Sequence, residues 1–225
     1  MKIKTIEDLR TASLKRIRSQ FSVVLERTVQ ELNGVSCIQM EETSKPRQQI
    51  IVSRSFGTMV TGLDDLSESF AYYTTRAAEK LRRDGSVATS ISVYIHTNPF
   101  KEETPQYNGA ITVPLNQPSD DTMELINAAI KGLKEIYRSG FHYKKSGVLL
   151  MGLRSKGSVQ ATLFDDTDKQ AKSVNMMRTL DAINKKMGKG SITLAASGLK
   201  HRWAMRRERQ SPNYTTDWFE LPEVE

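Results

Sequence analysis

The sequence predicts an α+β fold whose centre is a four-stranded sheet with two helices on one face. Apolar and polar residues alternate over 86–96 and again over 108–115, which is the period of a half-buried strand. Over 65–83 and 122–137 the apolar residues recur at helical spacing. The two remaining strands are expected at 49–56 and 145–153. The resulting order, β-α-β-β-α-β, places both helices on one face of the sheet and leaves the other face open.

Short helices are expected before the sheet, in residues 1–33. The residues that can cap their first turns are Thr5, Ser13 and Ser22. Gly34 follows the last of these runs, where a helix commonly ends. Residues 34–46 are mixed polar and contain Pro46, so we expect a linker between the helices and the sheet.

The two periods also assign a face to each side chain of the sheet module. Within 86–96, the face away from the apolar residues carries Ser90, Ser92, Tyr94 and His96. The residues predicted to be buried are Leu66, Phe70, Tyr73, Ala77 and Leu81 in the first helix, and Met123, Ile126, Ile130, Leu133 and Tyr137 in the second. An open face that is largely small and polar suits a flat polar partner.

The chain after the sheet reads as a linker followed by a small helical part. Residues 155–172 are rich in Ser, Gly, Asp and Lys, whereas residues 173–187 return to helical spacing before Gly188. The apolar face expected for this helix is Met176, Leu180, Ile183 and Met187. Ser191–Ala195 is predicted to be a short strand, and Pro212 excludes a helix through the irregular tail.

The composition indicates a globular protein with a polyanionic partner. The 225 residues are 38% hydrophobic and 26% charged, with a net charge of +7 and a pI near 9.4. No apolar run reaches the ~20 residues that span a bilayer, and the N-terminus lacks the apolar stretch of a secretory signal. A single cysteine, Cys37, fits a reducing cytosol. We therefore expect a cytoplasmic protein with no membrane partner.

Hydroxyl and basic side chains that suit phosphate oxygens recur within the sheet module. The candidate DNA contacts are Ser53, Arg54, Ser55 and Gly57 in the first strand, Arg76 and Lys80 in the first helix, Ser90 in the second strand, and Lys144 and Lys145 in the last. Arg82 and Arg83 continue the basic helix face, although such a run is also commonly a solvated surface. Trp203, among the basic residues 200–209, either stacks on a base or packs on the preceding helix.

A short docking peptide is expected inside the linker. Gln160 is followed by two spacer residues and then by Leu163 and Phe164. Such a peptide binds by placing two apolar side chains in a preformed pocket while the amide fixes the register. A Leu-Phe pair is more often part of a core, so the flanking sequence decides its meaning.

No catalytic constellation is recognisable. The adjacent carboxylates Asp64–Asp65 and Asp120–Asp121 precede helices, where acidic residues cap the first turn, and Asp165–Asp166 lies in the linker. Three scattered histidines and one cysteine offer no metal-ligand spacing. We therefore predict neither catalytic nor metal-binding residues in this chain.

Several stretches together resemble the C-terminal half of the UmuC-type, Y-family translesion DNA polymerases. They are Val24 to Thr28, Ser53 to Gly57, Arg76 to Arg82, Gln160 to Asp166 and Ser211 to Trp218. The resemblance covers essentially the whole chain. It implies a thumb remnant in 1–33, a little-finger DNA-binding domain in 47–154, a linker with a sliding-clamp-binding motif in 155–172, and a C-terminal domain of unassigned role in 173–225.

The resemblance implies a part in DNA repair and the SOS response, with DNA, the bacterial sliding clamp, a UmuD-type accessory subunit and a recombinase filament as partners, and association with the nucleoid. The family is a DNA-directed DNA polymerase whose Mg²⁺-binding carboxylates lie in the palm. Palm and fingers have no counterpart here, so we expect no cofactor in this chain and no polymerisation by it alone. The alternatives are one chain of a split polymerase, a non-enzymatic duplex DNA-binding remnant, and an RNA-binding module of the same strand order, which would need paired aromatic residues on its central strands.

Overall fold

A computed structural model describes residues 3–38, 46–101, 103–158, 167–206 and 210–221. The chain divides into two compact units, Met1–Pro46 and Arg47–Glu225. The first unit contains three helices, α1 (Ile6–Arg10), α2 (Leu14–Gln20) and α3 (Val23–Leu32). Two of the predicted caps are confirmed, because Thr5 forms a capping box with Asp8 and the Ser22 hydroxyl accepts from the Leu25 amide. Only Ile17 and Val29 are buried hydrophobic residues among the described part of this unit.

The second unit contains the predicted β-α-β-β-α-β module. Its elements are β1 (Gln49–Val60), α4 (Leu63–Arg83), β2 (Ser86–Thr97), β3 (Asn108–Ser119), α5 (Thr122–Ile136) and β4 (Tyr143–Met151). The strands lie in the order β1-β4-β2-β3, and a two-residue strand, β5 (Arg154–Ser155), pairs with β2. All the pairs are antiparallel. Each strand-helix-strand connection therefore passes over a strand that belongs to the other connection.

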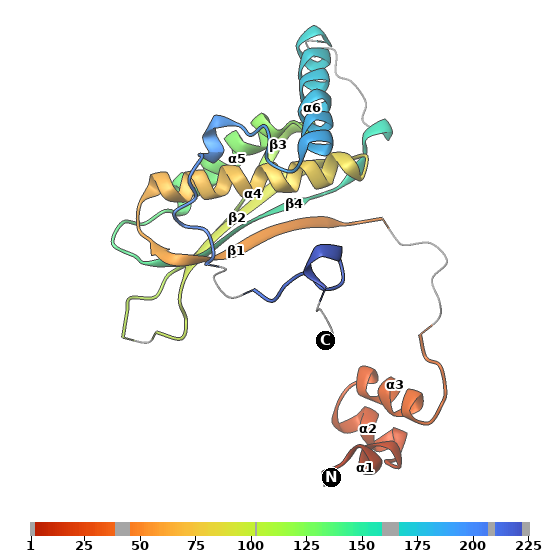
Figure 1. Cartoon of the computed structure of the whole chain (residues 1–225). Coiled ribbons are helices and arrows are strands. Elements are labelled where there is room, and N and C mark those ends of the chain that lie inside the picture. Colours follow the sequence, from red (N-terminus) through yellow and green to blue (C-terminus); the bar gives the residue numbers. More distant parts are fainter. Residues whose placement is uncertain (1–2, 39–45, 102, 159–166, 207–209, 222–225) are drawn as a thin grey trace. The chain divides into compact units, whose positions relative to one another are not determined.

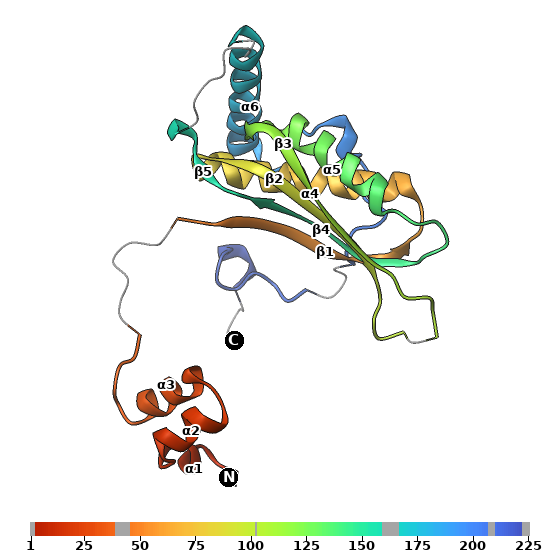
Figure 2. The same cartoon turned by 180° about the vertical axis from the view of Figure 1, so that it is seen from behind.

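Both helices lie on the same face of the sheet, as the fold prediction requires (Figures 1 and 2). The predicted stripe of α4 is confirmed, since Leu66, Phe70, Tyr73, Ala77 and Leu81 are buried against the strands. The core-facing residues of β2 are Ile91, Val93 and Ile95. Gly132 brings α5 close to the sheet, because a Cβ there would lie 2.8 Å from a methyl group of Val93.

The stripes of the other two helices agree with the predicted ones only in part, since Ile126, Leu133 and Leu180 are buried as predicted. In α5, Met123 is exposed, and the large or apolar side chains that are buried are Leu125, Ile126, Ala129, Leu133 and Ile136. In α6 (Thr167–Met187), which begins earlier than predicted, Met176 and Met187 are exposed, whereas Met177, Leu180 and Asn184 are buried. Helical spacing alone leaves a choice between adjacent positions, and the tertiary contacts of each helix decide it.

Residues 191–194 do not form the predicted strand. Instead, the side-chain amide of Asn184 binds the backbone of Ile192 with two hydrogen bonds. Its Nδ2 donates to the Ile192 carbonyl and its Oδ1 accepts from the Ile192 amide, each at 3.0 Å. Short 3₁₀ turns occupy Lys156–Ser158, Ala195–Ser197 and Trp218–Glu220. Among the described residues, no helix combines the length and the apolar character needed to cross a membrane.

Candidate nucleic-acid interface

The face of the sheet opposite the helices is a regular array, because the strand register aligns its side chains in rows. From one end to the other, the rows are Gln49, Met151, Ser90 and Pro114; Ile51, Leu149, Ser92 and Thr112; Ser53, Gly147, Tyr94 and Ala110; and Ser55, Lys145, His96 and Asn108. We call these rows the open face. They contain no carboxylate, and Lys145 supplies the positive charge. Apolar side chains such as Ile51 and Leu149 stand among the polar ones. The hydroxyls, the amides and the one lysine of these rows are suited to phosphate and sugar oxygens.

Two aromatic rings lie side by side on the open face. The rings of Tyr94 and His96 are nearly parallel, with an interplanar angle of 6° and centroids 6.2 Å apart. Gly147 leaves room for the tyrosine, because a Cβ at this position would lie 2.6 Å from the Tyr94 ring and hydroxyl. The Nδ1 of His96 lies 2.9 Å from the carbonyl oxygen of Thr97, which restrains the imidazole. The open face therefore carries two large aromatic side chains in addition to its small serines.

Four of the predicted DNA contacts come together on the open face. Ser53 and Ser55 lie on β1, Ser90 on β2 and Lys145 on β4. Ser55 and Lys145 are direct cross-strand partners in the same row. Because partners in a row share one face, these hydroxyls and the ammonium group can contact a single bound backbone.

Arg54 belongs to the opposite side of the pleat, and the Lys144 ammonium is bound to a backbone carbonyl of β1. Arg54 stands between Ser53 and Ser55, so its side chain starts toward the helical layer, where its guanidinium donates to the Ser53 carbonyl at 2.9 Å. Burial raises the pKa of Tyr73, and the charge of Arg54 acts in the opposite direction. The Lys144 ammonium donates to the carbonyl of Phe56 at 2.7 Å. Arg54 is therefore not part of the open face, and the ammonium group of Lys144 is already bound within the unit.

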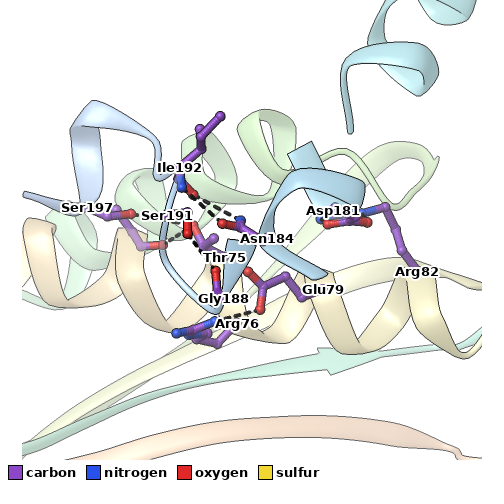
Figure 3. A network of polar contacts seen from close by, with 11 residues as sticks. Thr75, Arg76, Glu79, Arg82, Asp181, Asn184, Gly188, Ser191, Ile192 and Ser197 are labelled. Carbon is purple, nitrogen blue, oxygen red and sulfur yellow. Dashed lines mark hydrogen bonds and ion pairs between the residues drawn. The ribbon is translucent and has the colours of Figure 1, made fainter. Parts of the chain in front are cut away.

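Arg76 and Lys80 lie on α4, which the sheet separates from the open face (Figure 1). The guanidinium of Arg76 donates to Glu79 at 2.9 Å, and its central carbon lies 5.4 Å from the centre of the Tyr72 ring. Figure 3 shows this ion pair on the helix surface. The structure consequently divides the predicted DNA contacts between two faces of the unit.

Arg82 and Gly57 are already engaged inside the unit. The side chain of Arg82 is only 8% exposed and forms a two-pronged ion pair with Asp181 of α6, at 2.6 and 2.8 Å (Figure 3). The Gly57 amide donates to the carbonyl of Trp203 at 3.1 Å and is not free for a phosphate. Trp203 is buried against α4 and β1 rather than against the preceding helix, which resolves the two readings of this residue in favour of packing.

The predicted clamp-binding residues Gln160, Leu163 and Phe164 lie outside the described residues. In the part of the chain that the structure describes, no group of three or more His, Cys, Asp or Glu side chains is placed to hold a metal ion.

A family model described as the impB/mucB/samB family C-terminal domain matches residues 47–163. The chain belongs to this family. A second model, described as Domain of unknown function (DUF4113), matches residues 175–224. The sheet module thus carries the match to the family, in agreement with the predicted little-finger fold, and the segment after it matches a domain without a stated role.

Curated relatives support the same assignment. Protein UmuC of Salmonella typhimurium is 43% identical over 222 residues, which are 99% of this chain and 53% of the relative. Protein ImpB of Salmonella typhimurium is 40% identical over 220 residues, 98% of this chain and 52% of the relative. DNA polymerase IV of Clostridium acetobutylicum is 28% identical over 194 residues, 84% of this chain and 46% of the relative. The chain therefore spans about half the length of these relatives, and its resemblance to UmuC-type proteins is confirmed.

Proposed function

We propose that this chain is the DNA-binding and clamp-tethering part of a UmuC-type translesion DNA polymerase that acts in the response to DNA damage. The sheet module holds duplex DNA on its open face, and the Gln160–Phe164 peptide attaches the chain to the sliding clamp. The chain contributes no catalytic carboxylates. A UmuD-type subunit and a recombinase filament are further proposed partners.

The observation that carries the DNA-binding proposal is the chemistry of the open face. Its rows contain Ser53, Ser55, Ser90 and Lys145, and no carboxylate is among them. Because a carboxylate repels phosphate and a hydroxyl or ammonium group binds it, this face suits the backbone of a nucleic acid better than an acidic partner. Membership of a family with DNA polymerases among its relatives supports the same partner.

Replacing Lys145 with Ala is expected to weaken duplex DNA binding about fivefold, or ~1 kcal/mol, and to reduce the slope of log affinity against log salt by about one. The reason is the loss of one phosphate contact and of the counterion that it releases. Fluorescence anisotropy with a labelled duplex at several salt concentrations measures both quantities.

Lys134→Ala is the matched control, because Lys134 is an exposed lysine on α5, behind the sheet. It should leave the salt slope almost unchanged. Equal effects of the two variants, or duplex binding that is insensitive to salt, would remove the open face as the interface. Competition between duplex DNA and single-stranded RNA tests the RNA-binding alternative, to which the paired rings of Tyr94 and His96 are relevant. Preference for the RNA would favour that alternative.

A second candidate function is completion of a polymerase active site together with palm and fingers from another polypeptide. The first unit favours it, because many of its large apolar residues are exposed. They include Ile6, Phe21, Val24 and Ile38. Exposed apolar residues gathered on one small unit commonly mark a surface that another polypeptide covers.

Primer extension tests this second candidate. The purified chain alone is expected to extend no primer, and addition of a separately produced palm and fingers from the same family is expected to restore extension. Phe21→Ser with Val24→Ser should then reduce the restored activity, whereas the exposed polar pair Arg16→Ser with Gln20→Ser should not. Extension by the chain alone would contradict the prediction that it carries no catalytic carboxylates.

A further inference from the structure

The segment that follows α6, residues 188–206, runs along α4 and reaches the edge strand β1 (Figure 1). The Asn184–Ile192 hydrogen bonds turn the chain back toward α4, where the hydroxyls of Ser197 and Thr75 lie 3.5 Å apart (Figure 3). Ser197 itself is buried. The segment of unknown role is therefore in close contact with the sheet module.

Trp203 inserts into the hydrophobic core of the sheet module. Its side chain is 4% exposed, and its ring centroid lies 5.4 Å from that of Tyr73, 5.7 Å from that of Tyr72 and 6.3 Å from that of Phe56. The tyrosines belong to α4 and the phenylalanine to β1. One side chain from the C-terminal segment thus joins a helix and a strand, and such aromatic contacts add to the stability gained from burial.

Glu68 of α4 holds the same segment by its carboxylate. Its Oε1 accepts from the indole nitrogen of Trp203 at 3.0 Å and lies 3.1 Å from Nδ1 of His201. Gly198 makes this approach possible, because its φ is +68° and a Cβ there would lie 2.2 Å from the Glu68 carboxyl carbon. A left-handed glycine and a shared carboxylate therefore fix the beginning of the segment on α4.

The end of the segment completes β1 where its pairing with β4 is interrupted. The register of this pair is regular up to Ser55 and resumes at Val60. Within the gap, the Phe56 carbonyl accepts from Lys144 at 2.7 Å and the Gly57 amide donates to the carbonyl of Trp203 at 3.1 Å. A Cβ on Gly57 would lie 2.4 Å from the Ala204 carbonyl oxygen. Backbone groups that β4 leaves unpaired are thus satisfied by a lysine and by the C-terminal segment.

We propose that residues 195–206 form a clasp that holds β1 against α4 and so positions Ser53 and Ser55 on the open face. Residues 195–206 lie within the match to a domain of unknown function, so the clasp would make this segment part of the DNA-binding unit. The compact units agree with this, since residues 47–225 form one unit although two family models divide them. The role in positioning the open face rests on the proposed DNA binding, whereas the structural role of the clasp does not.

The test compares the replacement of Trp203 with that of Trp218 in the full chain. Trp203→Ala should make the Gly57 amide exchange with solvent about tenfold faster or more, relative to the Val93 amide in the centre of the sheet, and should weaken duplex binding several-fold. Trp218→Ala is the control, because Trp218 is 86% exposed, and it should change neither. Trp203→Phe keeps an aromatic ring in the core and should restore most of the DNA affinity.

A milder pair of variants keeps the test informative if Trp203→Ala does not fold. Gly198→Ala strains the clasp and meets Glu68, whereas Gly190→Ala strains a left-handed glycine with no atom within 4 Å of the added Cβ. Only Gly198→Ala should accelerate exchange at Gly57. Equal exchange within each pair of variants would overturn the clasp. Faster Gly57 exchange with unchanged DNA affinity would overturn the positioning role, and faster exchange in a chain that binds no DNA would keep the structural clasp while removing the proposed function.

Discussion

Replacing Arg82 with Ala should lower the free energy of unfolding of the unit 47–225 by about 3 kcal/mol. The guanidinium of Arg82 joins three elements, since it pairs with Asp181 of α6 and donates to the Asp120 carbonyl at 2.8 Å and to the Thr122 hydroxyl at 2.7 Å, both at the start of α5. Its loss removes the polar contacts that join α4 to α6 and to the start of α5.

The partial exposure of Asp181 sets the size of this effect. Breaking a buried ion pair commonly costs ~3–5 kcal/mol, because the remaining charge stays buried without a partner. The side chain of Asp181 is 34% exposed and water can solvate it once Arg82 is gone, so the lower end of that range applies. Asp181→Ala leaves the guanidinium, which is far more buried, without its counterion. Arg82→Lys keeps the charge but loses the two-pronged geometry and should recover only part of the stability.

Arg83 provides the matched control, because it is the next residue of α4 and is exposed. Arg83→Ala should change the free energy of unfolding by less than about 0.5 kcal/mol. Denaturant unfolding is followed by Trp203 fluorescence in a Trp218→Phe background, in which the buried tryptophan is the single reporter. If Arg82→Ala and Arg83→Ala unfold at the same denaturant concentration, the ion pair does not anchor α6. A double-mutant cycle with Asp181→Ala gives the coupling between the two side chains.

The parts of the fold that sequence reasoning predicted are those with a strong local period. The α4 stripe from Leu66 to Leu81 and the alternation of β2 follow from helix and strand geometry, and both are present. The strand order β1-β4-β2-β3 does not follow from any local pattern, since it depends on pairings between distant residues. Helical spacing predicts Met123 in the core, but Met123 is exposed because spacing alone does not fix which side of α5 meets the sheet.

The candidate site shows the same division. Ser53, Ser55, Ser90 and Lys145 share a face, and strand alternation could have separated Arg54 from its neighbours in advance. No local sequence pattern predicts the hydrogen bond from the Gly57 amide to the Trp203 carbonyl, because the two residues are far apart in the sequence. A tryptophan within a basic stretch is compatible with both nucleic-acid stacking and burial, and only the tertiary contacts with Tyr72 and Tyr73 distinguish them.

Replacing both Leu163 and Phe164 with Ala is expected to weaken binding to the bacterial sliding clamp about a thousandfold. Each apolar side chain of a docking peptide commonly contributes about 2 kcal/mol when it fills a pocket, so loss of both removes ~4 kcal/mol, which corresponds to that change in affinity. Surface plasmon resonance with immobilised clamp measures it. Thr162→Ala, at a spacer position, should change the affinity by no more than about twofold.

The same double variant distinguishes a docking peptide from a piece of core. If Leu163 and Phe164 serve only the clamp, the variant should keep the free energy of unfolding and the duplex DNA affinity of the unchanged chain, because nothing in the folded unit depends on them. If they are core residues, each truncation should cost ~2–5 kcal/mol of stability, and DNA binding would fall together with folding. Loss of clamp binding with intact stability and intact DNA binding therefore establishes the tether, and clamp binding that survives the double replacement removes it.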